Sequence, residues 1–160
     1  MSVHYNPYFD PTNGHPYVEI AGIKWATMNV GATSETDAGL YFAWGDTQGY
    51  TASQVGTDKQ FTWADYKFNP SGDGTTMTKY NATDGLVQLD LEDDAAHVIM
   101  GGNWRMPTEA ELTILLNNIT NQETTVNGVK GRMFRSKTDI TKELFFPKSY
   151  CSNSKINNDF

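Results

Sequence analysis

The residues best suited to hold a metal ion lie in the run Asn69-Pro-Ser-Gly-Asp-Gly74. Oxygen-bearing side chains occupy its first, third and fifth positions and glycine its sixth, as in a calcium-binding loop. The bidentate glutamate that such a loop needs at its twelfth position is missing, because Tyr80 stands there. A glycine-rich turn is therefore the better interpretation, and we expect neither a metal nor another cofactor.

Two residues could serve acid–base or nucleophilic catalysis. His97 follows Asp94 and Asp93 by three and four residues, so a carboxylate could orient its imidazole on one helix face. No nucleophile accompanies it, and a structural histidine at a helix end is the favoured interpretation. Cys151 is the single cysteine, and its sequence neighbours supply neither a base nor a positive charge. We therefore expect no enzymatic activity and no internal disulfide.

Aromatic side chains punctuate a polar stretch, residues 46–86, that contains hardly an aliphatic residue. We take Trp63, Tyr66, Phe68 and Tyr80 as candidate ligand-binding residues, because aromatic faces bind sugar rings and also anchor protein interfaces. The alternative is that these side chains only pin a long loop to the domain. The sequence leaves both interpretations open.

A short helix is expected after Asp93 and Asp94, whose negative charges suit the positive end of a helix dipole. Gly101 and Gly102 would end it, because glycine accepts the left-handed conformation that closes a helix. The two helices are joined by the connector Asn103-Trp104-Arg105-Met106. We expect Trp104 to lie beneath the helix pair, and Arg105 to reach the carboxylate of Asp93 or Asp94.

A second helix is expected to begin at Thr108, which forms a capping box with Glu111. Apolar residues then recur at the spacing of one helix face and predict a stripe that packs on a core. These residues are Leu112, Leu115, Leu116 and Ile119.

Strands are expected on both sides of this helical region. Residues 17–20 and 23–27 predict a hairpin that turns at Ala21-Gly22. Residues 128–135 and 143–146 predict two late strands. The apolar run 40–44, which ends in Trp44, is expected to be a buried strand or a buried loop.

The composition indicates one domain and excludes some partners. The chain has 160 residues and a formal net charge of −7, so a phosphate backbone would be repelled and nucleic acid is not an expected partner. No apolar run is long enough to cross a bilayer, and the first residues lack the pattern of an export signal. We expect no membrane insertion.

Several of these motifs together resemble a known family. The segment 91–118, the runs 15–34 and 39–46, and the shorter matches 78–80 and 127–131 are similar to C-type-lectin-like modules of Bacteroidetes and Fibrobacter surface proteins, the major paralogous domain family. The resemblance spans residues 14–147. It implies an α+β, C-type-lectin-like fold in which two short helices pack on antiparallel sheets with long irregular loops.

The resemblance also implies how the chain is divided. Residues 1–13 would be an N-terminal extension, 14–147 the domain, and 148–160 a polar tail or the truncated end of the domain. We expect structural roles for six residues: Trp25, Trp44, Asp93, Asp94, Trp104 and Arg105. The connector is more distantly similar to formylglycine-generating enzymes, which act through cysteines near the end of the domain, whereas this chain has only Cys151.

The expected function is a non-enzymatic binding or adhesion module for a glycan or a protein, located outside the cell, at a cell surface or on a virion. One alternative is a structural subunit of a fimbria or phage particle, which would form a homo-oligomer or a larger assembly. The other is a modifying enzyme of the formylglycine-generating type, which the single cysteine disfavours.

Overall fold

The computed structural model describes residues 10–149, and Cys151 lies outside this part of the chain. The fold is α+β, with few helices and two antiparallel sheets. The elements in chain order are β1 (Tyr17–Ile20), β2 (Ile23–Ala26), the 3-10 helices η1 (Trp63–Asp65) and η2 (Leu91–Asp93), α1 (Ala95–Met100), α2 (Glu109–Asn118), β3 (Ile119–Val126), β4 (Val129–Ser136) and β5 (Glu143–Pro147).

The expected hairpin is confirmed as β1 and β2, with Ile20 opposite Ile23. Ala21 and Gly22 form the two-residue turn, and both have positive φ, 52° and 79°. A turn of this kind matches the right-handed twist of the strands it joins.

The larger sheet has the order β3-β4-β5 and contains the two expected late strands. Asn127 and Gly128 connect β3 to β4, again with positive φ at both positions. Consecutive residues of a strand point to opposite faces, and both Leu144 and Phe145 of β5 are buried. At β5 the sheet is therefore covered on both faces.

Both expected helices are confirmed. The carboxylate of Asp94 caps α1 by accepting hydrogen bonds from the amides of Ala96 and His97, and Gly101 has φ 70° at its end. Thr108 and Glu111 form both hydrogen bonds of the capping box at the start of α2.

The core lies where α2 and β5 meet the hairpin β1–β2. Ile20, Leu115, Ile119 and Leu144 form its buried centre, and Trp25 packs against it as a partly buried side chain. The prediction of one apolar stripe on the second helix was wrong in part. Leu112 and Leu116 are exposed, and Ile119 begins β3, where its side chain joins the core from a strand.

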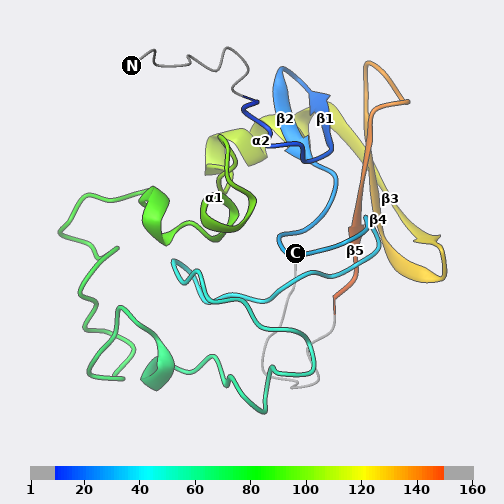
Figure 1. Ribbon diagram of the computed structural model, residues 1–160. Helices are drawn as coiled ribbons and strands as arrows, with labels where there is room; N and C mark the ends of the chain where they lie inside the picture. Colours follow the sequence, from blue (N-terminus) through cyan, green and yellow to red (C-terminus); the bar gives the residue numbers. More distant parts are fainter. Residues whose placement is uncertain (1–9, 150–160) are drawn as a thin grey trace, which may run out of the picture.

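The N-terminal turn and the long irregular segment lie in different parts of the molecule (Figure 1). Residues 60–90 lie on the side of the molecule away from the three-stranded sheet. The turn at residues 10–14 is tied to the end of α1, because the side-chain amide of Asn13 donates to the carbonyl of Met100 and the amide of Asn103 donates to the carbonyl of Pro11. The N-terminal turn is thus held against the end of α1, away from the irregular segment.

Among the residues that the structure describes, no helix has the length and apolar character needed to cross a bilayer.

Candidate functional site

The four candidate ligand-binding residues form one continuous row, which we call the aromatic ladder. Ring centroids are 5.9 Å apart between Trp63 and Tyr66, 5.7 Å between Tyr66 and Phe68, and 5.1 Å between Phe68 and Tyr80. Each pair is close to edge-to-face, which is the geometry that aromatic quadrupoles favour. The ladder therefore links η1 to the residues that precede η2 by direct ring contacts.

The four rings differ in exposure. Phe68 is 8% exposed, Tyr66 and Tyr80 are half-buried, and Trp63 is 55% exposed. Phe68 and Tyr80 thus hold the loop to the domain. Trp63 is the member of the ladder with a large area left for a ligand.

Two glycines let the backbone approach these rings closely. A Cβ atom on Gly74 would lie 2.9 Å from Cδ1 of Trp63, and one on Gly45 would lie 2.7 Å from Cε2 of Phe68. Both glycines have positive φ. The indole of Trp63 is therefore backed by the main chain at Gly74, which restricts its movement.

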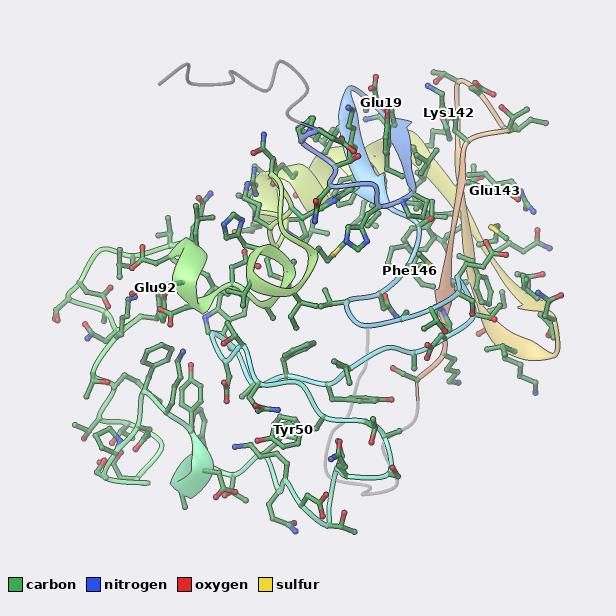
Figure 2. The ribbon with its side chains drawn as sticks, in the orientation of Figure 1. Glu19, Tyr50, Glu92, Lys142, Glu143 and Phe146 are labelled. Carbon is green, nitrogen blue, oxygen red and sulfur yellow. The ribbon has the colours of Figure 1, made fainter. Side chains whose placement is uncertain are left out.

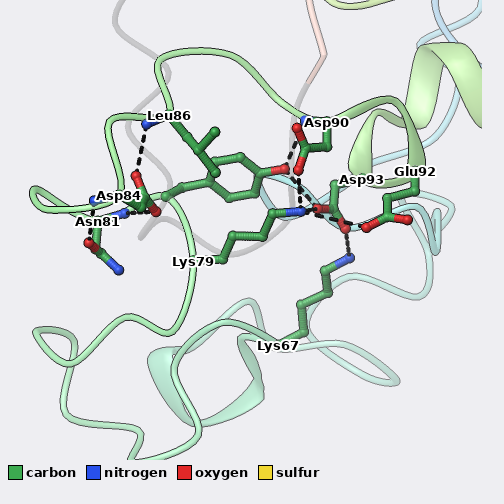
Figure 3. A network of polar contacts seen from close by, with 9 residues as sticks. Lys67, Lys79, Asn81, Asp84, Leu86, Asp90, Glu92 and Asp93 are labelled. Atoms are coloured by element: carbon green, nitrogen blue, oxygen red, sulfur yellow. Dashed lines mark hydrogen bonds and ion pairs between the residues drawn. The ribbon is translucent and has the colours of Figure 1, made fainter.

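A buried carboxylate anchors the segment that carries the ladder (Figure 3). Asp93 accepts hydrogen bonds from Nζ of Lys67 at 2.7 Å, Nζ of Lys79 at 2.6 Å and the hydroxyl of Tyr80 at 2.7 Å. Burial alone would raise the pKa of Asp93, but these three donors hold that pKa well below its usual range. The carboxylate stays ionised and joins Lys67, Lys79 and Tyr80 of the aromatic segment to η2.

Tyr80 is held in an uncommon backbone conformation, with φ 59°. Its hydroxyl donates to Asp93 and also accepts a hydrogen bond of 2.9 Å from the amide of Asp90. Burial, more than the hydrogen bond to Asp93, raises the pKa of Tyr80. Because a non-glycine residue at positive φ persists only where its surroundings fix it, these contacts account for the conformation.

The acidic residues near η2 could in principle hold a cation. Oxygens of Asp90, Glu92 and Asp93 lie within 4.8 Å of one another. The ammonium group of Lys79 occupies this cluster, at 2.7 Å from Asp90, 3.7 Å from Glu92 and 2.6 Å from Asp93. The place that a cation would take in this cluster is therefore already occupied by an ammonium group of the protein.

The calcium-like run is a hydrogen-bonded turn. The side-chain oxygen of Asn69 accepts from the amide of Asp73 and the hydroxyl of Ser71. The carboxylate of Asp73 accepts from the amides of Thr75 and Thr76 and from the Thr76 hydroxyl. These bonds use the oxygens that a calcium ion would need.

The expected partner of Arg105 was wrong. Its guanidinium makes two hydrogen bonds to Glu111, at 2.9 and 2.6 Å, and not to Asp93 or Asp94. The reason is that both aspartates have other partners: Asp93 binds the two lysines, and Asp94 caps α1 and accepts the amide of Met106 at 2.7 Å. Arg105 thus supports the capping box of α2.

Trp104 is half-buried and does not belong to the core cluster. Its indole N–H donates a hydrogen bond of 2.7 Å to the carbonyl of Thr12, which ties the connector to the N-terminal turn. Nδ1 of His97 lies 3.1 Å from the carbonyl of Trp104. The imidazole of His97 is thus positioned by a backbone carbonyl, as a structural histidine would be. The carboxylate of Asp94 accepts a hydrogen bond from the backbone amide of His97.

The expectation of a buried run ending in Trp44 was also wrong. Residues 40–43 are half-buried and irregular, with one bridge between Tyr41 and Tyr50, and Trp44 is 54% exposed. Gly45 is the buried residue here, because the ring of Phe68 covers it. Trp44 is therefore exposed beside the backbone that supports the ladder.

Sequence reasoning missed a second aromatic contact in this region. Tyr50, labelled in Figure 2, lies edge-on to Phe61 at 5.9 Å, and Nζ of Lys59 lies 5.8 Å from the centroid of each ring. Phe61 has φ 49°. Lys67 and Lys79 were missed as well, since nothing local marks them as partners of Asp93.

One cavity lies apart from the ladder, between the start of the domain and the end of α1. Its volume is about 130 Å³, and its lining includes His15, Met28, Ile99 and Met100. Sites for small molecules measure about 300–1,000 Å³, so this cavity is too small for a sugar or a cofactor.

Comparison of the chain with family models, with curated proteins and with solved structures gives no significant match.

Proposed function

We propose that the protein is a non-enzymatic binding module of the C-type-lectin-like type, which recognises a glycan or a protein on a cell or virion surface through the area around Trp63. The observation that carries this proposal is the aromatic ladder, which ends in an indole that is 55% exposed. The α+β fold, with its helix pair and a long irregular segment set apart from the sheet, is consistent with such a module.

Rigidity of the contact surface supports binding as its role. The ladder, the main chain at Gly74 and the bonds to Asp93 fix the position of Trp63 before any ligand arrives. A surface ordered in advance loses less entropy on association, so a given contact contributes more to affinity. An exposed, fixed indole is also a common anchor of protein interfaces.

The roles of the titratable groups support a function without catalysis. Asp93, Asp94 and Glu111 each accept hydrogen bonds that hold a loop or cap a helix. His97 contacts a backbone carbonyl. Groups engaged in this way stabilise the fold and are poorly placed to exchange protons with a substrate.

The test is a binding survey with matched variants. Labelled protein is applied to a printed glycan array and to a pull-down from a bacterial surface extract. We expect a reproducible partner in one of them, lost on Trp63→Ala and retained by Tyr17→Ala, which removes an exposed aromatic side chain from β1. Two blank surveys at high protein concentration, or a partner that Trp63→Ala retains, would contradict the proposal.

A second candidate is an assembly subunit of a fimbria or phage particle. The exposed aliphatic side chains of the two helices favour it, since Val98 and Ile99 on α1 and Leu112 and Leu116 on α2 lack cover. Such residues mark association surfaces where they are contiguous. Light scattering separates the candidates, because an assembly subunit would form a defined oligomer and a simple binding module would remain monomeric.

A further inference from the structure

Residues 46–93, which include the ladder, are strongly acidic. Their carboxylates are Asp46, Asp58, Asp65, Asp73, Asp84, Asp90, Glu92 and Asp93, and their only cationic side chains are Lys59, Lys67 and Lys79. The net charge of this segment is therefore negative, with eight carboxylates against three ammonium groups.

All three lysines are already engaged. Lys67 and Lys79 bind Asp93, and Lys79 also binds Asp90. Lys59 donates to the carbonyl of Asp65. Two of the three ammonium groups are thus bound to carboxylates, and Lys59 contacts a neutral carbonyl, so the segment keeps a net negative charge.

The carboxylates nearest to Trp63 in sequence accept hydrogen bonds from neutral groups. Asp65 belongs to the same 3-10 turn as Trp63, and its carboxylate accepts the hydroxyl of Thr62. Asp73 directly precedes the glycine that backs the indole, and it accepts only amides and hydroxyls from its loop. The Thr76 hydroxyl and the amides of Thr75 and Thr76 hold the pKa of Asp73 well below its usual range. Both carboxylates are thus bonded to neutral groups.

An exposed indole on an acidic segment fits one ligand chemistry. The negative face of an aromatic ring attracts a cation, most of all over tryptophan. Guanidinium groups stack on such faces and also pair with carboxylates. A neutral sugar would use the ring but would gain nothing from the surrounding charge.

We propose that Trp63, with Asp65 and Asp73 beside it, takes an arginine or lysine side chain from a basic segment of a protein partner. This inference rests on the proposed function, because it specifies the ligand of the same surface. Charge complementarity would speed association and would weaken binding as salt rises.

The probe is an end-blocked Arg-Gly-Arg-Gly-Arg peptide, with a control in which citrulline replaces each arginine. Citrulline keeps the shape of arginine and lacks its charge. Binding is followed by the indole ¹H–¹⁵N signals of the protein. We expect the arginine peptide to shift the Trp63 signal and to bind about five- to tenfold more tightly than the citrulline peptide, as a cation–π contact would produce.

Variants locate the effect on the surface. Trp63→Leu should abolish binding, and Asp65→Asn should reduce it about two- to threefold, whereas Glu123→Gln on the exposed strand β3 should leave it unchanged. Circular dichroism of each variant checks that the fold is retained.

The outcomes separate this inference from the proposed function. Equal binding of the two peptides, or no binding of the arginine peptide, overturns the inference. If a neutral glycan then binds at Trp63, the proposed function stands with a different ligand. If neither peptide nor any glycan or extracted protein binds, both are overturned.

Discussion

Lys67 donates a hydrogen bond of 2.7 Å to the buried carboxylate of Asp93, which lies 26 residues further along the chain. Lys79 and Tyr80 donate to the same carboxylate. One side chain of η2 thus binds the middle of the ladder segment, at Lys67, and its Tyr80 end. The exposed position of Trp63 depends on this anchor, so variants of Asp93 connect stability to binding.

Replacing Asp93 with asparagine should lower the free energy of unfolding by about 2 kcal/mol, because charge-assisted hydrogen bonds are lost and both lysines lose their shared partner. Fully buried pairs cost more, but the two lysines are partly exposed. Urea denaturation measures the change. The matched control is Asp90→Asn, whose side chain is half exposed and should matter little. Equal effects of the two variants would contradict the anchoring role.

The pH dependence of stability should report the pair formed by Glu111 and Arg105. The bonds from Arg105, and then from the Thr108 amide, lower the pKa of Glu111 from 4.5 to about 2. A carboxyl whose pKa is lower in the folded state stabilises the fold above pH 4.5 and loses that effect as the pH falls toward 2.

Wild type and Glu111→Gln should therefore differ by about 1–2 kcal/mol at neutral pH, because the pair is only partly buried, and should converge as the pH falls to about 2. Urea midpoints from pH 7 to 2 measure the two curves. A constant difference across this range would mean that the charge of Glu111 does not contribute.

Trp104 should be less important to stability than a core tryptophan. Because its indole is half-buried, Trp104→Ala should cost about 2 kcal/mol, below the 3–5 kcal/mol of a fully buried ring. Trp104→Phe keeps most of the apolar area and removes the bond to Thr12, so it should cost about 1 kcal/mol. If the alanine variant loses no more than the phenylalanine variant, the packing of this ring has been overstated.

Gly74 should matter to the position of Trp63 beyond its own backbone conformation. Gly74→Ala and Gly85→Ala both place a side chain at positive φ, which costs about 1 kcal/mol each. Only the Gly74 variant also pushes on the indole, since nothing lies within 4 Å of a Cβ at Gly85. We expect Gly74→Ala alone to change the tryptophan fluorescence and weaken binding. Identical spectra for the two variants would show that the main chain at Gly74 does not hold the ring.

The helices and the first hairpin could be predicted because their signals are local. The capping box at Thr108 and Glu111, the glycine at position 101 and the turn at Ala21-Gly22 each act within a few residues, so the sequence contains the whole motif. The expected helical stripe was extended too far at Ile119, because an apolar residue at the right spacing is equally suited to begin a strand.

The contacts of the site could be predicted only in part. The ladder residues were named from composition, but their order and the exposure of Trp63 depend on how the loop folds back. The partners of Asp93 come from segments 14 and 26 residues away, and pairing over such distances leaves no periodic signal. Arg105 was assigned to the wrong carboxylate for a different reason. Several acidic residues, Glu111 among them, lie within reach of it in sequence, and spacing alone does not choose between them.

We propose Trp63 as the contact residue of a surface that is ordered before the ligand binds. The most direct measurement is the ¹H–¹⁵N spectrum of the four tryptophan indoles, assigned by substitution, with and without the partner found in the binding survey. We expect the Trp63 signal to move, and those of Trp25 in the core and Trp104 in the connector to stay in place. A bound partner that leaves the Trp63 signal unchanged would contradict the account.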